Sequence, residues 1–324
     1  MTSSYRTYVV GHSIVGVPLF SHIKTPFCAG GVTALNPDAK DIFIEEIKGD
    51  QYLSSDGTWK DIQVMREVIK VRLGFDVTLD IKYTENGVLM PKDIFHKETK
   101  PFHEHLVRGL WESDDIWNEG KQYALAQYFD PIMHDSLGGT EGVWPLFGES
   151  MRFQATRNED VKDPVRFIKK HRETTKIPFN FIYILEIGDI VYWQGGGALP
   201  ARLNNVAGGV YPKIGKNPAN KWQGRIPYDD YPYLINPKSG YIVSCNNHMA
   251  SANVKHGTSH AMTFTGRKSR VTEIIEELFA KTGNKVHERQ IQQMATDVLD
   301  VQARASLNDM LYCVDKATLN LSDA

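Results

Sequence analysis

The chain has 324 residues, a formal net charge of −2 and an isoelectric point near 6.6. Without an excess of basic residues it has little with which to neutralise phosphates, so we expect no nucleic acid partner. No apolar run approaches the roughly 18 residues that a membrane-spanning helix needs, so we expect no membrane span. The three cysteines, Cys28, Cys245 and Cys313, are too far apart to indicate a zinc site or a disulfide framework, and nothing in the sequence indicates a compartment.

The first half of the chain has the pattern of short strands joined by tight turns. Glycines and prolines separate several apolar runs, and two later runs alternate apolar and polar side chains, which predicts a hairpin with one face on a core. The predicted strands are residues 8–10, 14–20, 41–47, 64–71 and 77–83. Residues 91–150 mix Pro, Gly, His and charged residues, and we interpret them as a loop-rich, insertion-like region around one strand at 123–129.

The second half alternates strands with helices. Apolar side chains at helical spacing predict a helix at 159–175, and two apolar runs predict strands at 179–185 and 190–193. Residues 195–221 are rich in Gly, Pro and Asn and predict an extended surface loop of the kind that is often functional. Two predicted helices close the chain, at residues 271–281 and 288–314.

The stretch 222–248 contains the most informative run of residues. A turn at Asn236, Pro237 and Gly240 leads into a short apolar run, which predicts a buried strand ending at Asn246 and Asn247. An Asn side chain offers two donors and one acceptor without charge, so it can stabilise a developing oxyanion at any ordinary pH. The local sequence taken alone favours a simpler interpretation, in which the two Asn side chains satisfy the backbone of a turn.

Six motifs follow one another along the chain. They are G-V-T-x-x-x-x-D-x-x-D-I-F-x-E (31–45), N-F-I-Y-x-x-x-x-G-D-I (180–190), G-x-x-P-x-R (197–202), W-x-G-x-I-P-Y (222–228), N-P-x-S-G-Y-I-x-x-x-N-N (236–247) and R-V-T-E-I (270–274). In this order, and with similar gaps, they resemble the penicillin acylase (penicillin amidase) family of N-terminal-nucleophile hydrolases over nearly the whole chain.

The resemblance implies an α+β fold, the αββα sandwich of N-terminal-nucleophile hydrolases. In that sandwich two antiparallel sheets pack face to face under outer helices, and we expect it to be incomplete in this chain. Residues 1–324 then form one partial domain, the central part of the family's nucleophile chain. Members of the family cleave linear amide bonds, such as the side-chain amide of penicillins or the acyl chain of acyl-homoserine lactones. Their nucleophile is a Ser that self-cleavage makes N-terminal, and its own α-amine acts as general base.

The resemblance also implies three catalytic positions. Ala34 matches the position whose backbone N–H is one donor of the oxyanion hole, and Asn246 matches the position whose side-chain amide is the other. Arg270 matches an arginine that orients groups around the nucleophile. Because we expect Arg270 to open a helix, where the helix dipole disfavours a cation, a specific partner is expected for it.

A structural calcium site is implied at the first motif. Asp38 and Asp41, with the backbone of Lys40, match part of that site, where hard carboxylate oxygens suit a hard cation. The alternative is that the two aspartates cap the turn into the 41–47 strand. Residues 247–269 contain no Asp or Glu, although the family draws another calcium carboxylate from this region. We therefore expect weak calcium binding unless a partner contributes oxygens.

The expected nucleophile has no counterpart in this sequence. Nothing in it matches the family's self-cleavage junction, and Thr2, which removal of Met1 would expose, lies too close to Ala34 in sequence to occupy the nucleophile's strand. Two hypotheses remain open, a piece of an amidohydrolase whose Ser comes from another chain, or a non-catalytic structural or binding subunit. Both predict a complementary protein chain that completes the sandwich in a hetero-oligomeric assembly, because an incomplete sandwich leaves open sheet edges.

Overall fold

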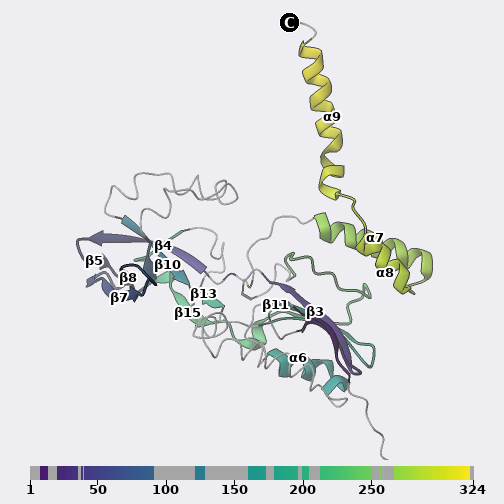
Figure 1. Ribbon diagram of the computed structural model, residues 1–324, viewed down its shortest axis with the longest axis horizontal. Helices are drawn as coiled ribbons and strands as arrows, with labels where there is room; N and C mark the ends of the chain where they lie inside the picture. Colours follow the sequence, from purple (N-terminus) through teal and green to yellow (C-terminus); the bar gives the residue numbers. More distant parts are fainter. Residues whose placement is uncertain are drawn as a thin grey trace, which may run out of the picture.

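The computed structural model describes residues 8–13, 20–35, 38, 40–90, 121–127, 160–172, 179–195, 199–203, 212–249, 255–256, 258 and 266–321. These residues form two large sheets, a small two-stranded ribbon and a group of helices at the end of the chain (Figure 1). All but one of the strand pairs are antiparallel. Most of the predicted loop-rich region, residues 91–120 and 128–150, lies outside the described residues.

The first sheet has six strands, in the order β1-β2-β3-β11-β12-β16. They are β1 (Val10–Ser13), β2 (Phe20–Lys24), β3 (Cys28–Ala34), β11 (Phe179–Leu185), β12 (Ile190–Gln194) and β16 (Tyr233–Ile235). The strands predicted at 179–185 and 190–193 are confirmed. The run predicted at 14–20 lies, except for Phe20, outside the described residues. In β3, a Cβ added at Gly30 would come within 2.3 Å of the Ile182 carbonyl oxygen, so glycine is needed for this close approach of β11.

One helix covers a face of this sheet. Helix α6 (Pro164–Arg172) follows a short 3₁₀ turn, η1 (Asp160–Lys162), and confirms the predicted helix at 159–175. Figure 1 shows it lying along the sheet that contains β3 and β11. Phe167 of α6 and Trp193 of β12 are fully buried, with ring centroids 5.8 Å apart, and Trp193 stacks on Phe181 at 4.9 Å. This aromatic cluster fastens α6 to the sheet.

The second sheet has eight strands, of which seven follow the order β6-β5-β4-β10-β9-β8-β7 and β14 pairs with β4 in parallel. They are β4 (Lys40–Lys48), β5 (Gln51–Leu53), β6 (Trp59–Asp61), β7 (Gln63–Ile69), β8 (Val77–Thr84), β9 (Gly87–Leu89), β10 (Lys121–Gln127) and β14 (Lys213–Ile214). Buried Phe43, Leu89 and Ala124 form its small core. The strand predicted at 41–47 and the hairpin β7–β8 are confirmed.

The expected burial of one hairpin face is not found. The register places Met65, Ile69, Val77 and Leu79 on one face of the hairpin, and all four side chains are exposed. The opposite face is mixed, with Val64 and Val68 exposed beside Arg66, which pairs with Asp80 at 2.7 Å. No element of the described residues covers the apolar face. An alternating pattern therefore predicts which side chains share a face of the hairpin, but it does not predict that another element packs against that face.

Two stretches before the C-terminal helices differ from the prediction. The predicted loop at 195–221 contains β14 and also β13 (Pro200–Arg202), which pairs with β15 (Trp222–Arg225) in the small ribbon. The strand predicted just before Asn246 is wrong, because residues 241–244 are irregular and β16 takes the place beside β12. Ser244 is held instead by its side chain, whose Oγ lies 2.6 Å from Oγ1 of Thr33.

Three helices end the chain: α7 (Gly266–Thr282), α8 (Glu288–Ala295) and α9 (Val301–Leu321). The single helix predicted at 288–314 is wrong, because Asp300 accepts hydrogen bonds from the N–H groups of Gln302 and Ala303 and so starts a new helix. Helix α9 extends away from α7 and α8 (Figure 1). In the described part of the chain no helix has the length and apolarity to cross a membrane.

Candidate functional site

Two of the three predicted catalytic positions meet in the structure. Ala34 is the last residue of β3, and the side-chain Nδ2 of Asn246 donates a hydrogen bond to the Ala34 carbonyl oxygen at 3.2 Å. Asn246 has φ of 61°, a left-handed conformation that Asn tolerates better than most residues. A carboxamide has two N–H donors, of which this bond uses one. The geometry therefore leaves Asn246 able to donate to an acceptor beside Ala34.

A buried polar pair supports Ala34 from the sheet. Asn180 of β11 is fully buried, and its Nδ2 donates to the Ala34 carbonyl oxygen at 3.2 Å, while Tyr192 of β12 donates to Asn180 Oδ1 at 2.9 Å. Burial raises the pKa of Tyr192, so its hydroxyl stays protonated and can donate. Sequence reasoning missed this pair, although Asn180 opens the N-F-I-Y motif.

The arginine that contacts Asn246 is Arg267. Its Nη2 donates to Asn246 Oδ1 at 3.0 Å and to the Cys245 carbonyl oxygen at 2.9 Å. Arg270 instead pairs with Asp297 at 2.8 Å and with Glu273 at 3.1 Å, and thereby ties α7 to the connection between α8 and α9. Since α7 begins at Gly266, Arg270 does not open the helix as the sequence led us to expect.

A cavity of about 630 Å³ adjoins this group. Cys245 and Arg267 line it on the side of Asn246, and Val271, Ile274 and Met294 give it apolar walls from α7 and α8. Arg270 lines the same cavity. The structure thus places Arg270 along the same cavity as Cys245 and Arg267, but gives it a different set of partners.

The predicted metal residues form an ion-pair cluster. Arg202 of β13 pairs with Asp38 at 3.0 Å and with Asp41 at 2.9 Å, and Lys213 of β14 also pairs with Asp41 at 2.9 Å. Lys40, whose backbone was expected to contribute, pairs with Gln127 in the ladder between β4 and β10. Among the described residues no group of three or more His, Cys, Asp or Glu side chains is arranged to hold a metal ion. With both carboxylates already paired to cations, these residues do not fit calcium, whose binding stays a prediction of the resemblance.

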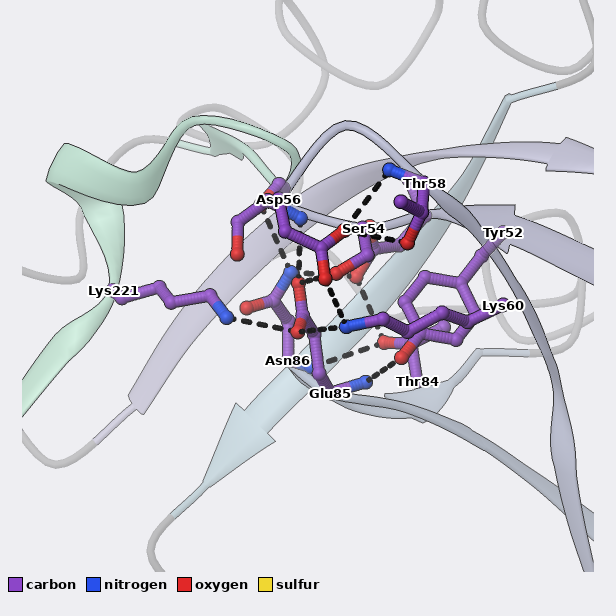
Figure 2. Close-up of polar contacts among 12 residues, drawn as sticks. Tyr52, Ser54, Asp56, Thr58, Lys60, Thr84, Glu85, Asn86 and Lys221 are labelled. Atoms are coloured by element: carbon purple, nitrogen blue, oxygen red, sulfur yellow. Dashed lines mark hydrogen bonds and ion pairs between the residues drawn. The ribbon is translucent and has the colours of Figure 1, made fainter.

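A second polar cluster joins two turns of the eight-stranded sheet to the connection between β14 and β15 (Figure 2). Glu85 accepts hydrogen bonds from the Ser54 hydroxyl at 2.9 Å and the Ser55 N–H at 2.8 Å, and it pairs with Lys221 at 2.8 Å. Partial burial works against ionisation, but the bonds from Lys221, Ser55 and Ser54 outweigh it and lower the pKa of Glu85 to about 2. The cluster contains no predicted catalytic residue. Its hydrogen bonds and ion pairs hold neighbouring loops together, so we interpret it as structural.

Glu45 lies beside this cluster, and its pKa shifts in the opposite direction to that of Glu85. It is fully buried, and one carboxylate oxygen accepts from Thr84 at 2.8 Å and from Asn86 at 2.9 Å. The other oxygen, Oε2, is buried without a hydrogen-bond partner among the described residues. Burial raises the pKa of Glu45 more than the two hydrogen bonds lower it. Ionising Glu45 therefore costs more free energy in the folded chain than in the unfolded one.

Glu45→Gln is expected to gain stability relative to the unmodified chain as the pH rises. The folded pKa lies above the unfolded value of about 4.3, so the stability contributed by neutral Glu45 is present at low pH and is lost as the pH rises through the folded pKa. Each unit of upward shift corresponds to about 1.4 kcal/mol. Thermal unfolding between pH 5 and 8 measures it, with Glu46→Gln, a surface partner of Lys216, as the control. A Tm difference for Glu45→Gln that stays constant or shrinks with pH contradicts the prediction.

Comparison with known proteins agrees with the motifs. The family model described as Penicillin amidase matches residues 2–323. A solved structure, the thermostable penicillin G acylase from Alcaligenes faecalis, superposes with a TM-score of 0.57 at 19% sequence identity. The match covers 93% of this chain and 52% of the acylase chain, so this chain spans about half the length of that relative. At this identity the match shows a similar mixed fold of antiparallel sheets and helices, as the sequence predicted.

Proposed function

Because the chain belongs to the penicillin amidase family, we propose that it supplies the oxyanion hole of an enzyme that cleaves linear amide bonds. The observation that carries the proposal is the meeting of Asn246 with Ala34 across 212 positions of sequence, at 3.2 Å. When a nucleophile attacks an amide carbonyl, negative charge develops on its oxygen. Donors fixed in advance around that oxygen stabilise the transition state more than the substrate.

Each residue of the site has a role in this proposal. The backbone N–H of Ala34 and the free amide hydrogen of Asn246 donate to the oxyanion. Arg267 fixes the Asn246 carboxamide through its oxygen, so that the NH₂ group points toward Ala34. Asn180 holds the Ala34 carbonyl from the other side, which orients the peptide group. Arg267 and Asn180 are therefore positioning residues.

The nucleophile in this proposal is an N-terminal Ser on another chain. That chain also completes the αββα sandwich, of which residues 1–324 form one partial domain. Exposed apolar surface in the described residues supports such a partner: Leu73 and Phe75, at the tip of the hairpin β7–β8, are 101% and 97% exposed. Large exposed apolar side chains of this kind are typical of surfaces that another protein covers.

Isolation of the native protein tests the proposal. We expect a copurifying chain whose mature N-terminus is Ser, identified by N-terminal sequencing, and an assembly that hydrolyses acyl p-nitroanilides. The alternative function, a non-catalytic structural or binding subunit, follows if the purified assembly contains every strand of both sheets but no free N-terminal Ser, Thr or Cys. Release of p-nitroaniline by this chain alone would instead contradict the need for a second chain.

A further inference from the structure

Two buried carboxylates lie at the start of the eight-stranded sheet. Asp38 is 3% exposed and belongs to the connection between β3 and β4, and Asp41, in β4, is 0% exposed. A buried carboxylate must be paired with positive charge or it destabilises the fold. Whether the fold needs a metal ion here therefore depends on which cation pairs with these two carboxylates.

The guanidinium of Arg202 occupies the centre of the cluster. Its Nη2 lies 3.0 Å from Asp38 Oδ1, 3.1 Å from the Asp38 carbonyl oxygen and 3.3 Å from Asp41 Oδ1. Its Nε donates to Asp41 Oδ2 at 2.9 Å. Three oxygens thus converge on one nitrogen, and a backbone carbonyl is among them, as in the oxygen set of a cation site. The side chain of Arg202 is only 4% exposed, so water does not screen these contacts.

The cluster is neutral and its second carboxylate has several donors. Lys213 Nζ and Trp222 Nε1 donate to Asp41 Oδ2 at 2.9 Å and 2.5 Å. Among the described residues two carboxylates face two cations, Arg202 and Lys213, so the formal charges of these four groups cancel. Adding a divalent cation would leave two uncompensated positive charges in a buried place. Calcium also requires six to eight oxygens at about 2.3–2.6 Å, closer than they can lie around a guanidinium nitrogen.

We propose that Arg202 is a built-in cation that replaces a divalent metal ion at this site. The proposal stands independently of amide hydrolysis, because it concerns how the fold is held together. Arg202 comes from β13, Lys213 from β14 and Trp222 from β15, so the cluster ties three later strands to β4. It also fixes the chain at Asp38, four residues after Ala34.

Thermal unfolding of the full chain, with any chain that copurifies, provides the first test. The unmodified protein is expected to have the same Tm in excess EDTA, in millimolar CaCl₂ and in millimolar MgCl₂. A Tm that falls in EDTA and recovers with CaCl₂ overturns the proposal. Stoichiometric calcium binding to the unmodified protein in isothermal titration calorimetry overturns it as well. This arm needs no variant.

Arg202→Met provides the second test. Methionine keeps an unbranched side chain but leaves two buried carboxylates with Lys213 alone, a net charge of −1. We expect Tm in EDTA to fall by about 5 °C or more and CaCl₂ to restore part of the loss, since the oxygens now lack their cation. Arg202→Lys, which keeps the charge, is expected to stay insensitive to calcium. An Arg202→Met protein whose Tm, or whose yield of folded protein, does not respond to CaCl₂ overturns the role of Arg202 as a replacement cation.

Arg66→Met is the matched control. Arg66 also pairs with an aspartate, Asp80, at 2.7 Å, but both side chains are exposed on the hairpin β7–β8. Its replacement is expected to leave Tm nearly unchanged and insensitive to calcium. A calcium response of the Arg66→Met protein equal to that of the Arg202→Met protein would mean that the response does not come from the buried cluster, which overturns the proposal.

Discussion

Replacing Asn246 with alanine is expected to lower kcat for amide hydrolysis by the complete assembly about 10²- to 10³-fold. This is the loss that follows removal of one oxyanion-hole donor, because the developing negative charge then lacks a fixed partner. Asn246→Asp is expected to be at least as damaging, since a carboxylate places an acceptor and a negative charge where a donor is needed. Steady-state kinetics with an acyl p-nitroanilide, using the chain reassembled with its partner, measures both.

The neighbouring Asn247 offers a control of the same residue type. Its Oδ1 accepts the Cys245 N–H at 2.9 Å and its Nδ2 donates to the His248 carbonyl oxygen at 3.1 Å, so it satisfies local backbone. Asn247→Ala is expected to keep kcat within a few-fold while lowering Tm slightly. Equal losses of kcat in the two alanine variants, at equal Tm, would contradict the assignment of the oxyanion donor to Asn246.

The regular elements of both sheets were predictable where a single pattern decided them. The hairpin β7–β8 shows a clear alternation of apolar and polar residues, and β11 and β12 are short apolar runs. Patterns of this length predict strands, and the structure contains all four. The strand predicted before Asn246 failed for a different reason. Its apolar run has a strand-like composition, as does that of β16, but only one segment can pair with the edge of β12. Which segment pairs there depends on tertiary packing, which the local sequence does not reveal.

The C-terminal helices show a second limit of local patterns. Helical periodicity continues from α8 into α9, so the sequence predicted one helix. The break depends on Asp300 capping the new helix and on Asp297 being held by Arg270, a residue of another helix. The cap could have been recognised from the sequence. The contact with Arg270 could not, because it depends on how α7 packs.

The site was predictable in its types of residue and less so in its pairings. The motifs grouped Ala34 with Asn246, and the two residues are in contact although no local pattern joins them. The sequence analysis named Arg270 and did not consider Arg267, because both lie in the first turns of α7 and only the direction of each side chain from the helix decides which one contacts Asn246. Asp38 and Asp41, grouped in the sequence as calcium ligands, share Arg202 as a partner. Their partner Arg202 belongs to the G-x-x-P-x-R motif, but no local pattern indicates that its side chain lies between them.

The largest loss of folding free energy among these predictions is expected for Trp193→Ala. Trp193 is 0% exposed and its ring lies 4.9 Å from that of Phe181 and 5.4 Å from that of Tyr183, both in β11. From α6, the rings of Phe167 and His171 lie 5.8 Å and 5.9 Å away. Removing the indole leaves a cavity between α6 and the sheet, which costs about 3–5 kcal/mol. Urea unfolding followed by circular dichroism measures the loss.

Trp59→Ala is the control for this loss, since Trp59 in β6 is 43% exposed and Lys48 Nζ lies over its ring, 5.9 Å from the centroid. We expect it to cost less than about 1 kcal/mol. Trp193→Phe, which keeps an aromatic ring against Phe181, is expected to fall between the two alanine variants. Equal losses for Trp193→Ala and Trp59→Ala would show that α6 does not pack on β12 as described. Because β12 also carries Tyr192, which supports Asn180 and through it Ala34, a loosened core is expected to lower kcat together with stability.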